Sequence, residues 1–451
     1  MNRTKVKNIF GVYAPIPIYT KNTSCRISCI YCPKEKDMPK SYTKNEDTLR
    51  ALKYDYCPKK QVEFFLRQID DIDKSNKPKK LELIILGGTF SELDILYREN
   101  FFKNIYDTLN ESTSKNLKDA KEKNKFAKYR ASIVNIETRP ELINSEECAF
   151  LLSLGISKVE IGVQSIYDNV LRSIKRPYNK KDIQNTTLLL RQFGFKISYH
   201  IMLNLPNSTP DTDFNMLKEI CTNDNFLPDG IKIYPLTLLK DNSLQPEMWN
   251  LYRTKKWKPY DEEEISSILI NFFDIVPKYI KIQRIQRQFD KDDFLYNKIH
   301  FRQIVNNKLK SKNKTLNCLR SYEMQTFKKN IYITALQNIK IDLILYGKNN
   351  YFLYATLQEN NLTYLLGYIR LYLDKKCIIR ELKVLGKSSK VGEKSLLQGK
   401  GLGKKLLASS EKIAKEKNYK EIYAITSPGI RNYYEKEGYL ETVNYMRKVI
   451  R

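Results

Sequence analysis

Three cysteines lie close together near the start of the chain, in the stretch SCRISCIYCP at residues 24–33. Cys25, Cys29 and Cys32 have the spacing C-x3-C-x2-C. Three thiolates on one loop can bind three irons of a 4Fe–4S cluster and leave the fourth iron open to a small molecule. A zinc site needs a fourth ligand, which the nearby sequence does not offer at zinc-ligand spacing. Zinc and ordinary buried thiols remain the alternatives, and the spacing favours an iron–sulfur cluster.

The elements that must position these thiols are strands that alternate with helices. Apolar runs that end in glycine or polar residues are the expected strands, at 79–90, 129–140, 156–165, 196–206 and 229–236. Segments with helical spacing follow each of them, so the pattern predicts a parallel α/β sheet. Chemistry in such sheets lies at the C-terminal strand ends. The candidate residues at those ends are Gly87, Gly88, Glu137, Arg139, Gln164, Asn204 and Lys232.

The pattern changes near residue 300. We expect a first domain over 1–300, a linker over 301–330 and a second domain over 331–451. Strands with short turns then predict a largely antiparallel sheet. The stretch QGKGLG at 398–403 stands at the start of an amphipathic helix. Backbone N–H groups of such a turn can bind a pyrophosphate, assisted by the positive end of the helix.

Several motifs resemble known families. The cysteine spacing, with Tyr31 before the third cysteine, is similar to the radical S-adenosylmethionine (SAM) superfamily, and GGT at 87–89 resembles the motif that receives the amino group of SAM. Further stretches resemble the catalytic subunit of Elongator, a family of tRNA wobble-uridine modifying enzymes: GGTFSEL, NIETRPEL, KVEIGVQSIYD, HIMLNLPN, PDGIKIYP and QRIQRQF. The resemblance covers roughly residues 10–450. It implies a radical SAM partial (βα) barrel followed by a GNAT acetyltransferase-like α+β domain.

The resemblance also implies a coupled reaction. An electron from the reduced cluster cleaves SAM, and the resulting radical takes a hydrogen from the methyl group of acetyl-CoA. The carbon radical adds to C5 of wobble uridine 34 in a tRNA, and hydrolysis releases CoA and leaves a carboxymethyl group. The expected cluster ligands are Cys25, Cys29 and Cys32, and the expected SAM pocket contains Gly87, Gly88, Glu137 and Gln164.

The remaining site residues come from the same resemblance. Lys232 matches an active-site lysine of the family; without the family it would be read as one half of a salt bridge. The expected acetyl-CoA residues are Glu381, Leu382, Val384, Gln398, Gly399, Lys400, Gly401, Leu402 and Gly403. Tyr433 and Tyr434 match tyrosines beside the thioester, where a hydroxyl can donate a proton or a hydrogen bond. Two helix tyrosines are otherwise packing residues.

The composition is strongly basic, with a net charge of +28 and a pI near 9.5. Such a chain attracts a polyanion such as tRNA, whose anticodon stem-loop is the expected partner, although an AT-rich genome also raises the lysine content. The basic run at 111–130 is either a solvated face or a contact to a nucleic-acid backbone. No apolar run is long enough to span a membrane, and no secretory signal is evident. We therefore expect a cytoplasmic protein with reduced thiols, in the host cytoplasm if the chain is viral.

Two departures from the Elongator family modify these expectations. Few residues precede the first strand, so other Elongator subunits are doubtful partners and a stand-alone enzyme is expected; a homodimer stays open. Many members carry a cysteine-rich zinc site in the linker, whereas this chain has Ser321 and Tyr322 after Cys318. We therefore expect no structural zinc.

Three rival functions remain open. The first is a protein-lysine acetyltransferase that uses the second domain alone. The second is a non-catalytic tRNA-binding protein with a degenerate radical SAM barrel. The third is a radical SAM methyl- or thiotransferase. The intact cysteine triad argues against the first, and the GNAT-like half argues against the third.

Overall fold

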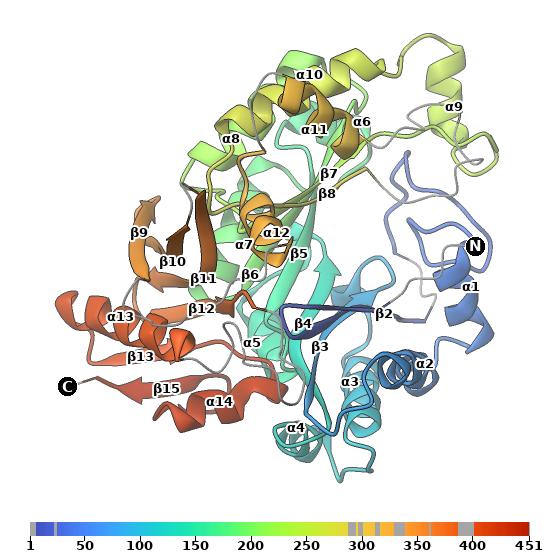
Figure 1. The fold of residues 1–451 in the computed structure, drawn as a ribbon. Coiled ribbons are helices and arrows are strands. Elements are labelled where there is room, and N and C mark those ends of the chain that lie inside the picture. Colours follow the sequence, from blue (N-terminus) through green and yellow to red (C-terminus); the bar gives the residue numbers. More distant parts are fainter. Residues whose placement is uncertain are drawn as a thin grey trace.

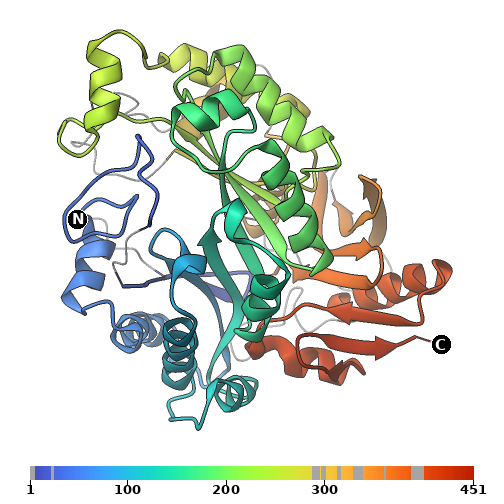
Figure 2. The same cartoon turned by 180° about the vertical axis from the view of Figure 1, so that it is seen from behind.

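The structure, a computed structural model, describes residues 6–21, 25–286, 295, 301–311, 316–328, 339–359, 362–386 and 401–450. It contains two sheets, one of eight strands in the order β1 to β8 and one of seven in the order β14-β15-β13-β12-β11-β10-β9. Figure 1 shows the second sheet beside the first, and Figure 2 shows the same arrangement from behind.

The first sheet is parallel except at its edge, where β1 runs antiparallel to β2. Its strands are β1 (Lys7–Ile9), β2 (Val12–Tyr19), β3 (Lys79–Leu86), β4 (Tyr129–Thr138), β5 (Lys158–Gln164), β6 (Lys196–Leu203), β7 (Gly230–Pro235) and β8 (Lys281–Ile285). Because β1 and β8 are not neighbours, the sheet is an open, partial barrel. The expected parallel fold is thus confirmed.

Helices connect these strands and cover their outer face (Figure 2). They are α1 (Glu46–Lys53), α2 (Pro58–Ile72), α3 (Ile95–Leu109), α4 (Leu117–Asn124), α5 (Ser145–Ser153), α6 (Asp168–Ser173), α7 (Lys180–Gln192), α8 (Pro210–Thr222), α9 (Pro246–Arg253), α10 (Glu262–Ile275), α11 (Phe301–Ser311) and α12 (Leu319–Lys328), with short 3₁₀ turns η1 (Phe90–Glu92) and η2 (Pro140–Leu142). Several begin at a residue whose side chain caps the free N–H groups of the first turn, among them Asn179, Thr209 and Asp261.

The strands β5, β6 and β7 have two different faces. Residues that pack on the helices are apolar and fully buried: Val159, Ile161, Ile197, Ile201, Ile231 and Ile233. Each contributes about 1.5–3 kcal/mol of burial free energy. The alternate residues face the interior of the half-barrel and are polar or glycine: Lys158, Glu160, Lys196, Ser198, His200, Gly230 and Lys232. The period of two therefore leaves a polar interior behind an apolar outer layer.

The second sheet is antiparallel except at one place. Its strands are β9 (Lys340–Tyr346), β10 (Asn350–Glu359), β11 (Leu362–Leu373), β12 (Cys377–Val384), β13 (Glu421–Ala424), β14 (Leu440–Glu441) and β15 (Met446–Val449), and its helices are α13 (Leu402–Glu416) and α14 (Arg431–Lys436). β12 runs parallel to β13, but their register ends at Ile379 and Ala424. The remaining residues of β12 extend beyond this pairing, so the two strands separate there.

The basic run at 111–130 has a structural role that the sequence did not reveal. It forms α4, and Lys125 at its end makes ion pairs with Glu435 at 3.2 Å and with Glu441, both from the C-terminal domain. The predicted solvated face is therefore wrong for this lysine, because its charge is paired across the domain contact.

The segment expected to be a linker, residues 301–330, contains helices. Its described residues form α11 and α12, and the side chains of Phe301, Val305 and Leu309 are buried at helical spacing. Lysine and asparagine between them concealed that period. Among the described residues, no helix is long and apolar enough to cross a membrane.

Candidate active site

The three cysteines lie on the loop between β2 and α1, at the C-terminal edge of the first sheet. Cys29 is buried, and Cys25 and Cys32 are partly exposed. The loop turns back on itself where the N–H of Cys32 donates to the carbonyl of Cys29 at 3.1 Å. Lys40 secures the loop, because its Nζ donates to the carbonyl oxygens of Cys25 at 2.6 Å and Ile27 at 3.0 Å.

Two arginines lie beside the thiols, Arg139 buried and Arg176 half-buried. Arg139, just after β4, donates from Nη1 to the sulfur of Cys25 at 3.1 Å. Arg176 donates to the hydroxyl of Tyr31, and its guanidinium lies 5.6 Å from that ring's centre. A hydrogen bond from Cys32, together with Arg176 and Arg139, outweighs burial and lowers the pKa of the Cys29 thiol to about 6. The surroundings of Cys29 therefore favour its thiolate, the form that binds metal.

Two glycines end β3 next to this loop. Gly87 and Gly88 have φ values of +136° and +101°, which side-chain-bearing residues rarely adopt. A Cβ on Gly87 would lie 2.1 Å from the hydroxyl oxygen of Thr20. The backbone here thus passes close to Thr20, the residue after β2, and to the carbonyl of Lys40.

The next strand ends carry the other expected residues. Glu137 lies near the end of β4 and accepts a hydrogen bond from the hydroxyl of Tyr42 at 2.9 Å. Gln164 ends β5 with φ +64°, and Asn204 follows β6 with φ +63°. Lys232 is the exception, because it is the third residue of β7 and not its end, as the sequence had suggested. The lysine therefore lies deeper in the half-barrel than the strand ends do.

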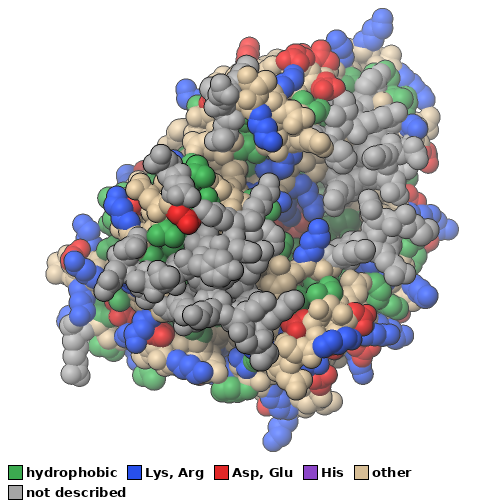
Figure 3. Space-filling model, in the orientation of Figure 1, with side chains coloured by type: hydrophobic (Ala, Val, Ile, Leu, Met, Phe, Trp, Pro, Cys, Tyr) green, Lys and Arg blue, Asp and Glu red, His purple; other side chains and the backbone are tan. Residues whose placement is uncertain are grey.

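Lys232 belongs to a polar network around Glu160. One oxygen of Glu160, Oε2, accepts from Lys232 and from Nε2 of His200, the latter at 2.7 Å. The other oxygen, Oε1, accepts from Lys158 and Asn135, both at 2.8 Å. Burial alone would raise the pKa of Glu160, but Lys158, Lys232 and His200 outweigh it and hold that pKa well below its ordinary range. In Figure 3, which has the orientation of Figure 1, Lys and Arg side chains (blue) lie near the middle of the face toward the viewer.

A second candidate site lies where β12 separates from β13. A Cβ on Gly403 would lie 2.5 Å from the hydroxyl of Tyr433 and 3.7 Å from a methyl of Val384. The start of α13, the hydroxyl of Tyr433 and the end of β12 therefore meet. Tyr433 is 38% exposed, and burial raises its pKa to about 12, so the hydroxyl keeps its proton at neutral pH.

The other described residues expected at this second site lie partly in the core and partly on β12 or at the start of α13. Tyr434 is buried against the edges of two neighbouring tyrosine rings, so it is a packing residue. The Leu402 side chain is in the core, and Gly401 precedes α13 with φ +84°. Leu382 is half-buried on β12. Gln398, Gly399 and Lys400 lie outside the described residues.

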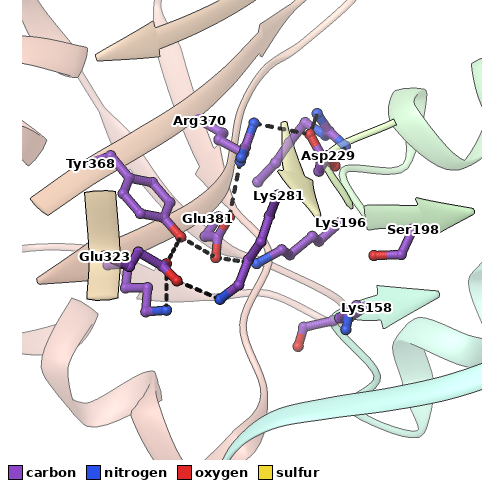
Figure 4. Close-up of polar contacts among 12 residues, drawn as sticks. Lys158, Lys196, Ser198, Asp229, Lys281, Glu323, Tyr368, Arg370 and Glu381 are labelled. Atoms are coloured by element: carbon purple, nitrogen blue, oxygen red, sulfur yellow. Dashed lines mark hydrogen bonds and ion pairs between the residues drawn. The ribbon is translucent and has the colours of Figure 1, made fainter. Parts of the chain in front are cut away.

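Glu381 does not point its carboxylate into the second site. It pairs with Lys196 of β6 and with Arg370 of β11, the latter at 3.0 Å. Figure 4 shows this pair beside a second carboxylate, Glu323, which pairs with Lys281 of β8 at 2.6 Å. The carboxylate of Glu381 is therefore bound by two cations, so any contact of this residue with a cofactor would use its backbone. Only its backbone stays on the β12 edge.

Comparisons with known proteins agree with this architecture. The radical SAM superfamily model matches residues 19–220, and the radical SAM C-terminal domain model matches residues 228–311. The tRNA uridine(34) acetyltransferase of Methanocaldococcus infernus is 33% identical over 99% of this chain and 87% of its own length. The chain belongs to the Elongator protein 3 family. Human Elongator complex protein 3 is 28% identical over 94% of this chain and 80% of its own length.

A solved structure of a family member also resembles this chain over nearly its full length. The archaeal Elp3 of Methanocaldococcus infernus with an N-terminal deletion (1–46) superposes with a TM-score of 0.81. It is 30% identical, and the match covers 98% of this chain and all of that one. The predicted combination of a radical SAM barrel with a second, mixed-sheet domain is thereby confirmed.

Membership of the radical SAM superfamily implies a 4Fe–4S cluster and SAM. The residues of this chain fit the cluster, since the loop offers three unoxidised thiols and two nearby arginines favour the thiolate of Cys29. Among the described residues, only Glu137, Glu160 and His200 gather as three side chains around a single-ion position. The three cysteines do not, which suits sulfurs that bind three separate irons better than one zinc.

Sequence reasoning missed the residues that organise this site. Glu160 and His200 stand in the motifs KVEIGVQS and HIMLNLPN, but their importance depends on strand register. His200 lies opposite Lys232, and Glu137 lies opposite Glu160. Arg176 follows α6 and carried no signal at all. The alternation of polar with apolar residues in three adjacent strands was the one clue available.

Proposed function

We propose that this protein is a tRNA-modifying enzyme that places a carboxymethyl group on C5 of wobble uridine 34, with acetyl-CoA as the source of the two carbons. It would act in the cytoplasm, where tRNA and acetyl-CoA meet. The relatives named tRNA uridine(34) acetyltransferase support the substrate and the position.

The observation that carries the proposal is the joining of two sites through one strand. β12 carries Val384 beside Tyr433 and Gly403, where an acyl-CoA would bind. The same strand carries Glu381, whose carboxylate pairs with Lys196 at the start of β6, a barrel strand. An acyl group held at β12 would therefore stand next to the barrel that holds the cysteine loop.

Each group of residues has a distinct task in this proposal. Cys25, Cys29 and Cys32 would hold the cluster, and the open backbone at Gly87 and Gly88 would receive SAM, with Glu137 and Gln164 beside it. When bound, the cluster and SAM supply the radical chemistry. Lys232 would face the reacting groups, and the hydroxyl of Tyr433 would donate to the thioester sulfur or carbonyl.

The acetyl-CoA site would use backbone groups more than side chains. The free N–H groups at the start of α13, from Gly401 to Gly403, can bind phosphate oxygens. Gln398, Gly399 and Lys400, which precede Gly401 in the sequence, would contribute to binding the same phosphates. The edge of β12 at Leu382 and Val384, beyond its pairing with β13, can bind the amide groups of the CoA arm.

The tRNA would be held by charge and read at its anticodon. A net charge of +28 favours the phosphate backbone, and this affinity should fall as salt rises. Bases are read in single-stranded loops, where they can leave the stack and enter a cavity. The wobble base would approach the half-barrel from the C-terminal strand ends, next to the cysteine loop.

The test is anaerobic incubation of the reconstituted protein with SAM, acetyl-CoA, a reductant and tRNA, followed by mass analysis of nucleosides. We expect carboxymethyluridine from the wild type, none from Cys29→Ala, and wild-type amounts from Cys221→Ala, which removes a buried thiol of α8 far from the loop. If the protein binds tRNA but does not modify it, the proposal is wrong. Acetylation of a basic peptide without SAM would favour the lysine acetyltransferase instead.

A further inference from the structure

The centre of the half-barrel holds one carboxylate that binds two donors on each oxygen. Glu160 has a side chain that is only 1% exposed. Lys232 and His200 share Oε2, and Lys158 and Asn135 share Oε1. A carboxylate with this set of donors is ionised and accepts only. Nε2 of His200 must therefore carry its hydrogen.

The position of Lys232 follows from this geometry. The ammonium group of Lys232 has three N–H groups, and one of them donates a hydrogen bond to Glu160. Glu137 lies 3.9 Å from Nζ of Lys232 and 3.9 Å from Nε2 of His200, which is too long for a hydrogen bond. Lys232 and His200 are therefore fixed by the same oxygen and lie side by side on β7 and β6.

Glu137, Glu160 and His200 alone would resemble a divalent-cation site, because their ligand atoms lie within 4.8 Å of one another. The Lys232 ammonium already supplies positive charge against both carboxylates. Burial alone would lower the pKa of Lys232, but Glu160, Tyr234 and Glu137 outweigh it and raise that pKa. The arrangement thus fits a permanently charged lysine better than a metal ion.

We propose that Glu160 is a positioning residue that holds Lys232 as an ammonium ion and His200 as its neighbour, so that Lys232 stabilises negative charge on a substrate oxygen and does not act as a base. The charged and titratable groups that face Lys232 are Glu137, Lys158, Glu160, His200 and Tyr234.

This inference rests on the proposed function for the kind of oxygen involved. The uracil ring and the thioester both present carbonyl oxygens, and both gain electron density during addition to C5 or loss of CoA. A fixed ammonium that need not reorganise is the type of group that stabilises such charge. A neutral, basic lysine would instead remove a proton, and the structure gives it no means to stay neutral beside Glu160.

The first test measures the protonation of Lys232 directly, without any cofactor. The lysines are reductively methylated with ¹³C, the Lys232 signal is assigned with Lys232→Arg, and its pKa is followed by NMR. In Glu160→Gln the partner charge is lost, so the pKa of Lys232 should fall by at least about one unit. An unchanged pKa would overturn the proposal.

Two further variants guard against a general loss of structure. Glu160→Gln leaves Lys158 and Lys232 without their shared counter-ion, so the double variant Lys158→Met/Glu160→Gln removes one of the two buried cations as well. The pKa of Lys232 should fall in this variant too. Glu263→Gln breaks an exposed pair with Lys308 and is the matched control, with no effect on Lys232.

The second test uses the modification reaction. Glu160→Gln should slow tRNA modification about 10–100-fold and restrict it to lower pH, where Lys232 is still charged. Glu160→Asp should recover part of the rate and of the pH range, and SAM affinity should change less than about twofold in both. If the wild type modifies no tRNA, the proposed function fails, while the NMR titration still decides the role of Glu160. An unaltered pH profile in Glu160→Gln would contradict the inference.

Discussion

Arg380 of β12 and Asp229, the residue before β7, form a buried bidentate ion pair between the two domains. Nη1 of Arg380 donates to Oδ1 of Asp229 at 3.1 Å, and Nη2 donates to Oδ2. Arg380 also binds the carbonyl oxygen of Phe195 at the start of β6. Asp229 stands three residues before Lys232, so β12 of the second domain directly anchors the start of β7 in the barrel.

Removal of this arginine should be costly. Arg380→Met leaves Asp229 buried, and among the described residues Arg370, at 3.4 Å, is then its cationic partner. We expect the free energy of unfolding to fall by about 3–5 kcal/mol, the usual effect of breaking a buried pair from one side. Urea unfolding measures it. Arg447→Met is the control, because its pair with Glu421 is partly exposed and should be worth at most about 1 kcal/mol.

The two glycines after β3 should differ in their tolerance of alanine. Gly87→Ala places a methyl group against Thr20 and forces an unfavourable φ, so the turn must move and SAM binding should be lost. Gly88→Ala meets only the carbonyl of Lys40 at 3.4 Å and should weaken binding less. Equilibrium dialysis with SAM measures both. Equal losses would mean that backbone strain, and not the contact with Thr20, dominates.

Removing the hydroxyl of Tyr433 or of Tyr434 should affect the modification rate differently. Tyr433→Phe removes the half-exposed hydroxyl beside Gly403 and Val384, so acetyl-CoA-dependent modification should slow about 10–100-fold. Tyr434→Phe removes a hydroxyl from a buried ring and should leave the rate within about twofold. Modification rates with saturating SAM measure both variants. A larger loss in Tyr434→Phe would reverse the assignment.

A buried acid near the end of β6 predicts a pH dependence of stability. Asp213 accepts hydrogen bonds from the N–H of Asn204 at 2.7 Å and the hydroxyl of Tyr260 at 3.1 Å, yet burial raises its pKa to about 7. Between its unfolded pKa, about 4, and about 7, the folded state binds more protons than the unfolded state. Stability should therefore fall as pH rises through this window, by up to about 4 kcal/mol from this group.

Asp213→Asn isolates this contribution. The variant cannot ionise, so its stability should depend less on pH between about 4 and 7 than that of the wild type. Chemical denaturation at several pH values measures the difference in slope, which cancels the other titrating groups. Parallel curves for the two proteins would show that Asp213 does not titrate in this range.

Much of the fold followed from local patterns. Apolar strands separated by helical segments predicted the parallel sheet, because strands buried on a helix layer and the helices that cover them differ in period. The cysteine spacing predicted a metal-binding loop for a similar reason: neighbouring ligands on one loop need no distant contacts. Cys25, Cys29 and Cys32 do stand together on one loop beside Gly87 and Gly88.

Tertiary structure decided the features that depend on register and domain contact. Glu160 became central only because four donors from four strands meet its two oxygens. Lys125 is paired and not solvated because it meets Glu441 of the other domain, and the carboxylate of Glu381 meets Lys196 in the same way; burial makes such pairing necessary. Sequence by itself determined which groups the chain has and how its elements alternate. Only the packed sheets determined which charges meet, because a pairing between distant residues leaves no local pattern.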